Sequence, residues 1–117
     1  MTRRTDRVAE ALQELVADLL LREIKDPRIG LITVTGVKVT ADLRHARIFF
    51  SCLGDEGRRA QALKGLASAA GFVRSQVARK LNLRAAPEIV FEFDPSLETA
   101  ERVARLLKGA LPGDSEP

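Results

Sequence analysis

Seven basic side chains lie in one stretch of the sequence that contains no acidic residue. The whole chain has 19 Lys and Arg residues against 16 Asp and Glu residues, and outside this stretch the acids outnumber the bases. Cations gathered on one surface without balancing acids are typical of proteins that bind the phosphate backbone of a nucleic acid. A solvated helix face would show the same pattern, and that alternative stays open. The seven cations are Arg58, Arg59, Lys64, Arg74, Arg79, Lys80 and Arg84.

A cluster of small residues interrupts the helical pattern that carries these cations. It runs from Ala67 to Gly71, and glycine disfavours a helix by about 1 kcal/mol relative to alanine, so we predict two helices that meet at Gly71. A helix that begins there would point free backbone N–H groups and the positive end of its dipole outward, next to Arg74, where a phosphate could bind. Close packing against Gly71 would explain the glycine nearly as well. The predicted phosphate contacts are Arg74, Arg79, Lys80 and Arg84, with Lys64, Arg3 and Arg4 as secondary contacts.

Catalytic and metal-binding groups are not predicted. The single histidine, His45, has no cysteine or carboxylate pattern around it, which favours a surface histidine. The single cysteine, Cys52, cannot form an internal disulfide, and one Cys with one His is too few for a zinc site. The sequence has no Ser, His and Asp arrangement, Walker loop or G-x-G-x-x-G. We therefore predict a protein that is not an enzyme and has no cofactor, metal or small-molecule substrate.

Two further patterns could be mistaken for RNA-binding features. A literal G-x-x-G, the loop of KH RNA-binding domains, occurs at residues 54–57, but its middle residues are both acidic and would repel the backbone that such a loop clamps. We interpret it as an ordinary turn. The five phenylalanines offer little for base stacking, because Phe50, Phe91 and Phe93 fit the core phase of predicted strands. Phe49 is the phenylalanine we expect to be most accessible.

Hydrophobic periodicity predicts the elements that position these side chains. Apolar residues at three-and-four spacing indicate helices, and β-branched or alternating runs indicate strands. A change in apolar phase predicts a bulge at Gly36, and the first two strands are expected to form a hairpin. The predicted elements are a helix over 5–25, strands over 31–40 and 46–51, two helices between 58 and 83, a strand over 87–93, and a helix from 96 to 109. The predicted apolar side after residue 58 consists of Ala60, Leu63, Leu66 and Ala67, then Val73, Val77 and Leu81.

This order predicts an α+β fold in which a three-stranded sheet has its helices on one face. The 117 residues fit one domain, expected over residues 1–110 with a flexible tail over 111–117. The outer face of the first helix carries Glu10, Glu14 and Asp18, so its middle is not expected to meet phosphate. No apolar run approaches the ~20 residues that span a bilayer, and the start lacks a secretory signal. We expect a cytoplasmic monomer.

Three stretches of the chain resemble the ribosome-binding factor A family, and together the resemblance covers roughly residues 3 to 108. The first runs from LLREIKDPR at residues 20–28 into IGLITVT at 29–35. The second is VTADLRHAR at residues 39–47. The third is AGFVRS at residues 70–75, followed by LRAAPE at 83–88 and DPSL at 94–97. Their order along the chain makes the resemblance specific.

The resemblance implies a type-II KH-like fold in the order helix-strand-strand-helix-kink-helix-strand, here followed by a C-terminal helix. The family carries Ala-x-Gly at the kink in place of G-x-x-G, which corresponds to Ala69 and Gly71 in this chain, and so implies that both residues bind RNA. It also implies binding to the free small (30S) ribosomal subunit and its 16S rRNA, support of late rRNA processing and maturation, and importance for growth in the cold.

Two other functions remain open at the level of the sequence. One is a general single-stranded RNA or DNA binder of KH type, which would bind nucleic acid away from the ribosome. The other is a protein-interaction module that uses the acidic first helix. Binding through phosphates should weaken steeply with salt, whereas the protein-interaction function predicts little response.

Overall fold

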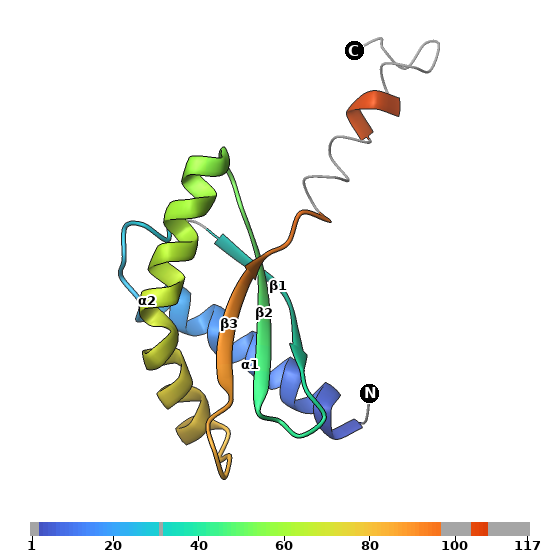
Figure 1. Cartoon of the computed structure of the whole chain (residues 1–117), viewed down its shortest axis with the longest axis vertical. Helices are drawn as coiled ribbons and strands as arrows, with labels where there is room; N and C mark the ends of the chain where they lie inside the picture. The colour runs from blue at the N-terminus through green and yellow to red at the C-terminus, as the bar shows by residue number, and fades with distance from the viewer. Residues whose placement is uncertain (1–2, 31, 97–103, 108–117) are drawn as a thin grey trace.

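The computed structural model describes residues 3–30, 32–96 and 104–107, and it has the predicted α+β architecture (Figure 1). Its three strands form one sheet in the order β1-β2-β3, and α1 and α2 supply buried residues to the same face of that sheet. The elements are α1 (Arg3–Arg22), β1 (Ile32–Val39), β2 (His45–Cys52), α2 (Glu56–Lys80) and β3 (Glu88–Phe93).

The first helix forms where the three-and-four spacing of apolar residues predicts it. Leu12, Val16 and Leu19 are fully buried, so this stripe faces the core. The helix ends three residues short of the predicted Lys25. The Leu19 carbonyl accepts backbone hydrogen bonds from both Glu23 and Ile24, at 2.9 and 2.8 Å, which closes the last turn before the proline is reached.

The first two strands form the predicted antiparallel hairpin with the predicted bulge. Val34 pairs with Phe50 and Gly36 pairs with Phe49, so one residue of β1 has no partner across the ladder. Because side chains alternate along a strand, the extra residue restores the apolar side chains beyond it to the core face. Val39, after the bulge, is buried for this reason.

The third strand pairs with β2 in parallel, from His45 opposite Glu88 to Phe50 opposite Phe93. Parallel neighbours need a long crossover connection, and α2, which lies beside β3, provides it (Figure 1). This arrangement brings the loop before β3 to the same end of the sheet as the turn between β1 and β2. The backbone N–H of Glu88 donates to the carbonyl of Arg44 at 2.8 Å and joins the two loops.

The second helix is one continuous α-helix, and the predicted break at Gly71 is wrong. Gly71 lies within it, is exposed, and has nothing within 4 Å of the place where a Cβ would stand. The propensity cost of one glycine is about 1 kcal/mol, which burial of Val73 and Val77 on the same helix offsets. No second helix begins at Gly71, so the phosphate site expected at such a start is absent.

The G-x-x-G at residues 54–57 is the start of α2, in agreement with its interpretation as a turn. Asp55 is the N-cap, and its side chain accepts a hydrogen bond from the backbone N–H of Arg58 at 2.9 Å. A cap of this type stabilises a helix by about 1 kcal/mol. Asp55 of this motif therefore stabilises the start of α2.

The buried face of the first half of α2 differs from the predicted one. Leu66 is buried as predicted, but the other buried residues are Ala62 and Gly65, whereas the predicted Ala60, Leu63 and Ala67 face solvent. The cause is the loop after α1, which packs directly on Gly65. A Cβ at Gly65 would stand 2.6 Å from Cγ1 of Ile29. Only a residue without a side chain permits this approach. In the second half, Val73 and Val77 are buried as predicted.

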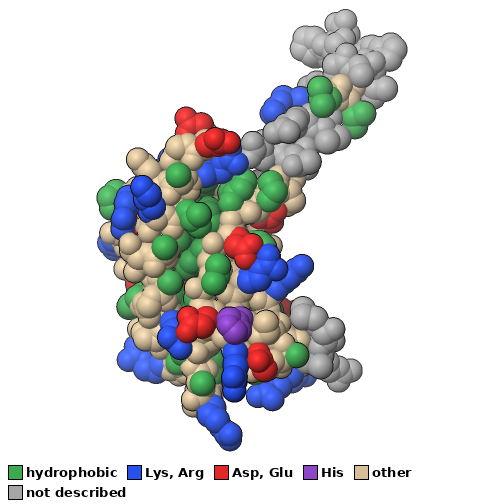
Figure 2. Space-filling view, in the orientation of Figure 1, with side chains coloured by type: hydrophobic (Ala, Val, Ile, Leu, Met, Phe, Trp, Pro, Cys, Tyr) green, Lys and Arg blue, Asp and Glu red, His purple; other side chains and the backbone are tan. Residues whose placement is uncertain are grey.

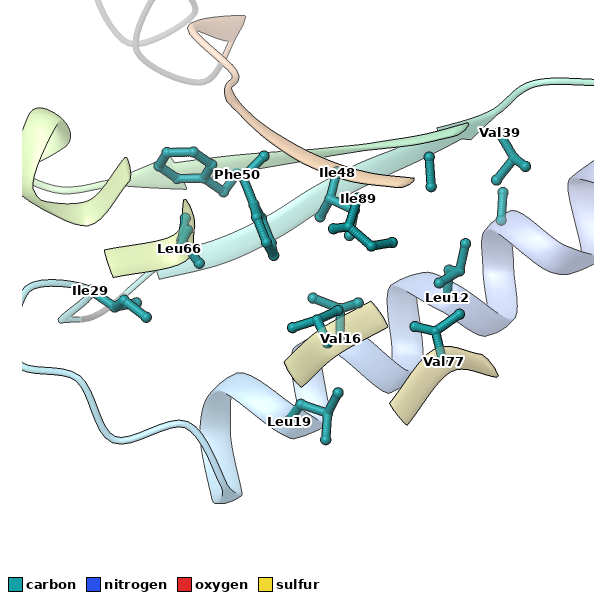
Figure 3. Packing of buried hydrophobic residues seen from close by; sticks show 14 of the residues in the cluster. Leu12, Val16, Leu19, Ile29, Val39, Ile48, Phe50, Leu66, Val77 and Ile89 are labelled. Atoms are coloured by element: carbon teal, nitrogen blue, oxygen red, sulfur yellow. The ribbon is translucent and has the colours of Figure 1, made fainter. Parts of the chain in front are cut away.

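The core lies between the sheet and the two helices (Figure 3). Phe50 and Ile48 of β2 are fully buried and meet α1 residues such as Leu12 and, from α2, Leu66. Burial of an apolar side chain of this size stabilises a fold by about 1.5–3 kcal/mol. The opposite face of the sheet carries exposed side chains, including those of Lys38, Arg47 and Val90.

The C-terminal helix is described only in part. Ser96 is helical, and the carboxylate of Asp94 accepts a hydrogen bond from its backbone N–H at 2.9 Å, which confirms the predicted capped start. Residues 104–107 are also helical. The rest of the predicted helix and the predicted tail at 111–117 lie outside the described residues. Among the described helices, none is long and apolar enough to cross a membrane.

Candidate nucleic-acid interface

Two of the seven cations in the acid-free stretch serve the fold itself. A guanidinium N–H of Arg58 donates to the carbonyl of Arg28 at 3.3 Å, which ties α2 to the loop after α1. The guanidinium of Arg59 lies over the ring of Phe93, 4.6 Å from its centre. Both side chains are half-buried. The five others are exposed: the four predicted phosphate contacts Arg74, Arg79, Lys80 and Arg84, and the predicted secondary contact Lys64.

Arg79 and Lys80 occupy the last turn of α2. Within the described chain, the only side-chain hydrogen bond of Arg79 is the one it donates to Oε1 of Gln76, at 3.3 Å. Cations near a helix C-terminus interact favourably with the helix dipole, by roughly 0.3–1 kcal/mol each. The position therefore has a structural role, while the exposed charges remain available to an anionic partner.

Arg74 and Arg84 meet two further arginines in a groove at the end of the sheet where the turn between β1 and β2 lies. This arginine groove has a volume of about 710 Å³. Its charged lining comes from the start of α1, the β1–β2 turn, α2, and the loop before β3. The charged residues are Arg4, Asp42, Arg44, Arg74, Arg84 and Glu88. His45 also lines the groove and is exposed, as predicted.

The two carboxylates of the arginine groove are already engaged. Asp42 accepts hydrogen bonds from the hydroxyl of Thr40 at 2.7 Å and from the backbone N–H of Arg44 at 3.0 Å. Both hydrogen bonds lower the pKa of Asp42 below its ordinary value, and the one from the Thr40 hydroxyl has the larger effect. A Glu88 carboxylate oxygen lies 3.4 Å from a guanidinium nitrogen of Arg74, which also donates to the carbonyl of Ala86 at 3.3 Å.

Ala69 and Gly71 lie on α2 away from the arginine groove. Ala69 is half-buried and Gly71 is exposed. Neither carries a polar side chain, so their contribution to a nucleic-acid interface would be a close approach of the ligand to the helix surface. Lys64 lies ten residues before Arg74, about 15 Å along the helix axis. The predicted contacts thus spread along α2, and only Arg4, Arg74 and Arg84 line the groove.

Two placements were missed or mistaken at the level of the sequence. Arg44 lines the arginine groove although it lies 40 residues from Arg4 and 40 from Arg84, and its place beside His45 in a turn carried no distinctive signal. Phe49 is half-buried, with the Arg47 guanidinium 5.0 Å from its ring centre. The more accessible ring is that of Phe72 on α2, which is 42% exposed. Arg3 begins α1, and its side chain lies outside what the structure describes.

Positive charge gathers at several places on the surface, with acidic side chains between them (Figure 2). Within the described part of the chain, no group of His, Cys, Asp and Glu residues could hold a metal ion. The exposed guanidinium and ammonium groups on α2 and around the arginine groove can bind anions. A three-stranded sheet with its helices on one face and exposed cations on α2 defines an α+β domain with a cationic surface.

Comparison with known proteins identifies the family. The family model described as Ribosome-binding factor A matches residues 4–107. The ribosome-binding factor A of Geobacter metallireducens is 48% identical over 108 residues, which are 92% of each chain. The chain belongs to the ribosome-binding factor A family.

Solved structures show the same fold. The solution NMR structure of a Thermotoga maritima protein has a TM-score of 0.70 at 32% identity and covers 77% of this chain and 86% of its own. Coordinates of the Thermus thermophilus ribosome binding factor A, fitted as a homology model into a cryo-EM map of its complex with the 30S subunit, have a TM-score of 0.61 at 24% identity. They cover 74% of this chain and 91% of theirs.

Proposed function

We propose that this chain binds the free small (30S) ribosomal subunit and its 16S rRNA, assists late rRNA processing and maturation of the subunit, and supports growth in the cold. Membership of the family and the 30S complex of the Thermus thermophilus protein support this function. The observation that carries it is the set of exposed cations on α2 and the adjoining loop, in a stretch without one acid.

The proposed contacts are the residues singled out by the sequence. Arg74, Arg79, Lys80 and Arg84 would bind RNA phosphates, with Lys64, Arg3 and Arg4 as secondary contacts. Ala69 and Gly71 would let the RNA approach the surface of α2 closely, since a Cβ at Gly71 would meet nothing within 4 Å and the site is open.

The mechanism we propose is positional. A protein that binds one conformation of the precursor RNA more tightly than the alternatives shifts the population toward that conformation, by as much as the difference in affinity. No bond is made or broken, and no cofactor or small-molecule substrate takes part. We propose that the protein acts in the cytoplasm as a monomer, with one domain over residues 1–110.

Sedimentation with purified small subunits tests this function. The protein is spun with mature and with precursor-containing subunits, at low and at raised salt, beside the double reversal Arg79→Glu/Lys80→Glu. Each phosphate contact contributes to a steep loss of affinity with salt, so co-sedimentation should fall when salt rises and when the charges are reversed. A matched control is Lys25→Glu/Lys38→Glu, which reverses two exposed cations outside the proposed contacts and changes net charge equally.

Three results would contradict the proposal in different ways. If the protein stays free of the subunits under all conditions, the proposal that it binds the ribosomal subunit is rejected. Equal binding to unrelated single-stranded RNA or DNA would favour the general nucleic-acid binder instead. Co-sedimentation that neither salt nor the reversal affects would favour a protein contact, with the acidic face of α1 as the first surface to examine. Melting temperatures of all variants are compared first, because both reversals at the end of α2 oppose the helix dipole.

A further inference from the structure

The arginine groove differs from the other cationic positions because it is hollow. Lys64, Arg79 and Lys80 stand on the outside of α2, whereas the groove encloses about 710 Å³ between two loops and two helices. This volume is within the range of about 300–1,000 Å³ that is typical of sites for small organic ligands. We propose that the arginine groove binds one unpaired nucleotide of RNA, with its phosphate on the arginines and its sugar and base against the apolar wall. This inference rests on the proposed function, because it takes the RNA to be the ribosomal RNA named there.

The charges in the groove favour an anion. Four arginines face two carboxylates, and both carboxylates are engaged, Asp42 within its own turn and Glu88 with Arg74. Arg4, Arg44 and Arg84 make no side-chain hydrogen bond or ion pair with the rest of the described chain. Planar guanidinium groups suit phosphate oxygens, which they can contact through two N–H groups at once. Arg44 and Arg84 come from the two facing loops, so a phosphate between them would be held from both sides.

The uncharged lining favours a nucleotide over a bare anion. Leu43 and Leu83 are half-buried, and Ala85 is exposed; all three line the groove. An apolar wall adds nothing to phosphate binding but packs against a sugar or a base. Single-stranded RNA is recognised through bases turned out of their strand, which stack on aromatic rings or on guanidinium planes. The groove has no Phe, Tyr or Trp side chain, so its arginines and the exposed imidazole of His45 are the groups that would stack.

The backbone on one side of the groove, in the β1–β2 turn, is held in an unusual conformation. Leu43 has φ of 60° and Asn82 has φ of 50°, and they are the only non-glycine residues with positive φ in the described chain. Leu43 lies in the β1–β2 turn that lines the groove and is strained, whereas Asn82 follows the Leu81 cap of α2, where a left-handed asparagine is an ordinary way to end a helix. Backbone strain persists where the surroundings determine it, and it concentrates at ligand-binding positions. The 2.8 Å hydrogen bond between Glu88 and Arg44 holds the two loops together. Loops already held in place lose less entropy when a ligand binds.

Amide chemical shifts of the full-length, isotopically labelled chain test the site directly. The probes are uridine 5′-monophosphate, uridine and inorganic phosphate, each added at constant ionic strength. The expected result is a saturable shift of the amides of residues 42–45, 83–86 and 88 with the nucleotide, and a weaker shift of the same amides with phosphate. Phosphate binding as tight as nucleotide binding would reduce the groove to an anion site and overturn the proposal, as would no saturable shift at these residues.

Binding of a labelled five-residue oligouridine to variants provides the second test. Arg44→Ala and Arg84→Ala should each weaken binding. Because both arginines contact the same phosphate, the double variant should lower the slope of log affinity against log salt by about 0.7, the share of one phosphate contact on a single strand, and each single variant by less. Lys25→Ala, an exposed cation outside the groove, is the matched control. An RNA duplex of the same length should compete poorly. Groove variants that bind like the control would overturn the proposal.

The two proposals can fail separately. Chemical shifts at the groove without co-sedimentation would keep the nucleotide site and reject the ribosomal partner. Co-sedimentation that Arg44→Ala and Arg84→Ala leave unchanged, together with unshifted groove amides, would keep the ribosomal partner and reject the nucleotide site.

Discussion

Two glycines of α2 should respond to the same substitution with opposite signs. Gly65 is buried against the loop after α1, where a Cβ would stand 2.6 Å from Cγ1 of Ile29 and 3.3 Å from its backbone nitrogen. Gly71 lies further along the same helix, is exposed, and would place a Cβ in open space. Alanine at both positions removes the same flexibility from the unfolded chain, so the difference between the variants reports the contact at Gly65.

The expected free energies follow from two effects. Glycine to alanine within a helix stabilises it by about 0.8–1 kcal/mol. Forcing an extra methyl group into a packed site costs about 1–3 kcal/mol. Ile29 is 5% exposed, and so has little room to move. We expect Gly65→Ala to destabilise the fold by about 1 kcal/mol net and Gly71→Ala to stabilise it by about the same amount.

Urea unfolding followed by the helical circular dichroism signal measures both values, and thermal unfolding checks them. For a chain of this length, 1 kcal/mol corresponds to a change in melting temperature of about 4 °C. The two midpoints should therefore lie on opposite sides of that of the unchanged protein. A stabilising Gly65→Ala would show that the loop after α1 does not press on α2. A destabilising Gly71→Ala would show that the helix needs a glycine there and would revive the predicted break.

Two further outcomes test the packing and the turn beside the groove. Leu66→Ala should lower the free energy of unfolding by about 2–5 kcal/mol because this side chain is fully buried. Leu63→Ala should change it by less than about 0.5 kcal/mol because its side chain is 41% exposed. Similar losses for both variants in urea unfolding would contradict the buried face assigned to α2. The pKa of Asp42 is lowered in the fold, chiefly by the Thr40 hydroxyl, so its charged form stabilises the fold above the ordinary value of 3.8, and this contribution is lost as pH falls from 3.8 through the folded value. Thermal unfolding should show the protein more stable than Asp42→Asn near neutral pH, with a difference that shrinks below pH 3.8; a difference independent of pH would refute the role of the charge.

Local chemistry decided most of the secondary structure, and so the sequence predicted it. The buried stripe of α1, the hairpin and the bulge at Gly36 all follow from spacings of apolar residues within a few positions of one another. The capped start at Asp94 follows from one acceptor side chain next to a proline. The cationic character of α2 is equally local, because the absence of acids between residues 58 and 84 can be read from the chain.

The face that α2 buries was not decided locally. Apolar residues occur on both sides of its first half, and the predicted face combined Leu66 with Ala60, Leu63 and Ala67. The loop after α1 instead packs on the side with Gly65, since Ile29 lies where Gly65 has no side chain, and Leu66 is buried together with Ala62. That contact joins residues 36 positions apart, and no periodicity within α2 contains it.

The arginine groove is a product of the tertiary structure alone. By themselves, Arg4, Arg44 and Arg84 are three exposed cations, each about 40 residues from the next. Parallel pairing of β3 with β2 brings the loop that carries Arg84 to the turn that carries Arg44, and the packing of α1 on the sheet adds Arg4. The amino-acid sequence by itself determined that this protein is basic and where its cations lie along the chain. The fold decided which of them share a cavity, because pairing between distant strands sets the distances between loops.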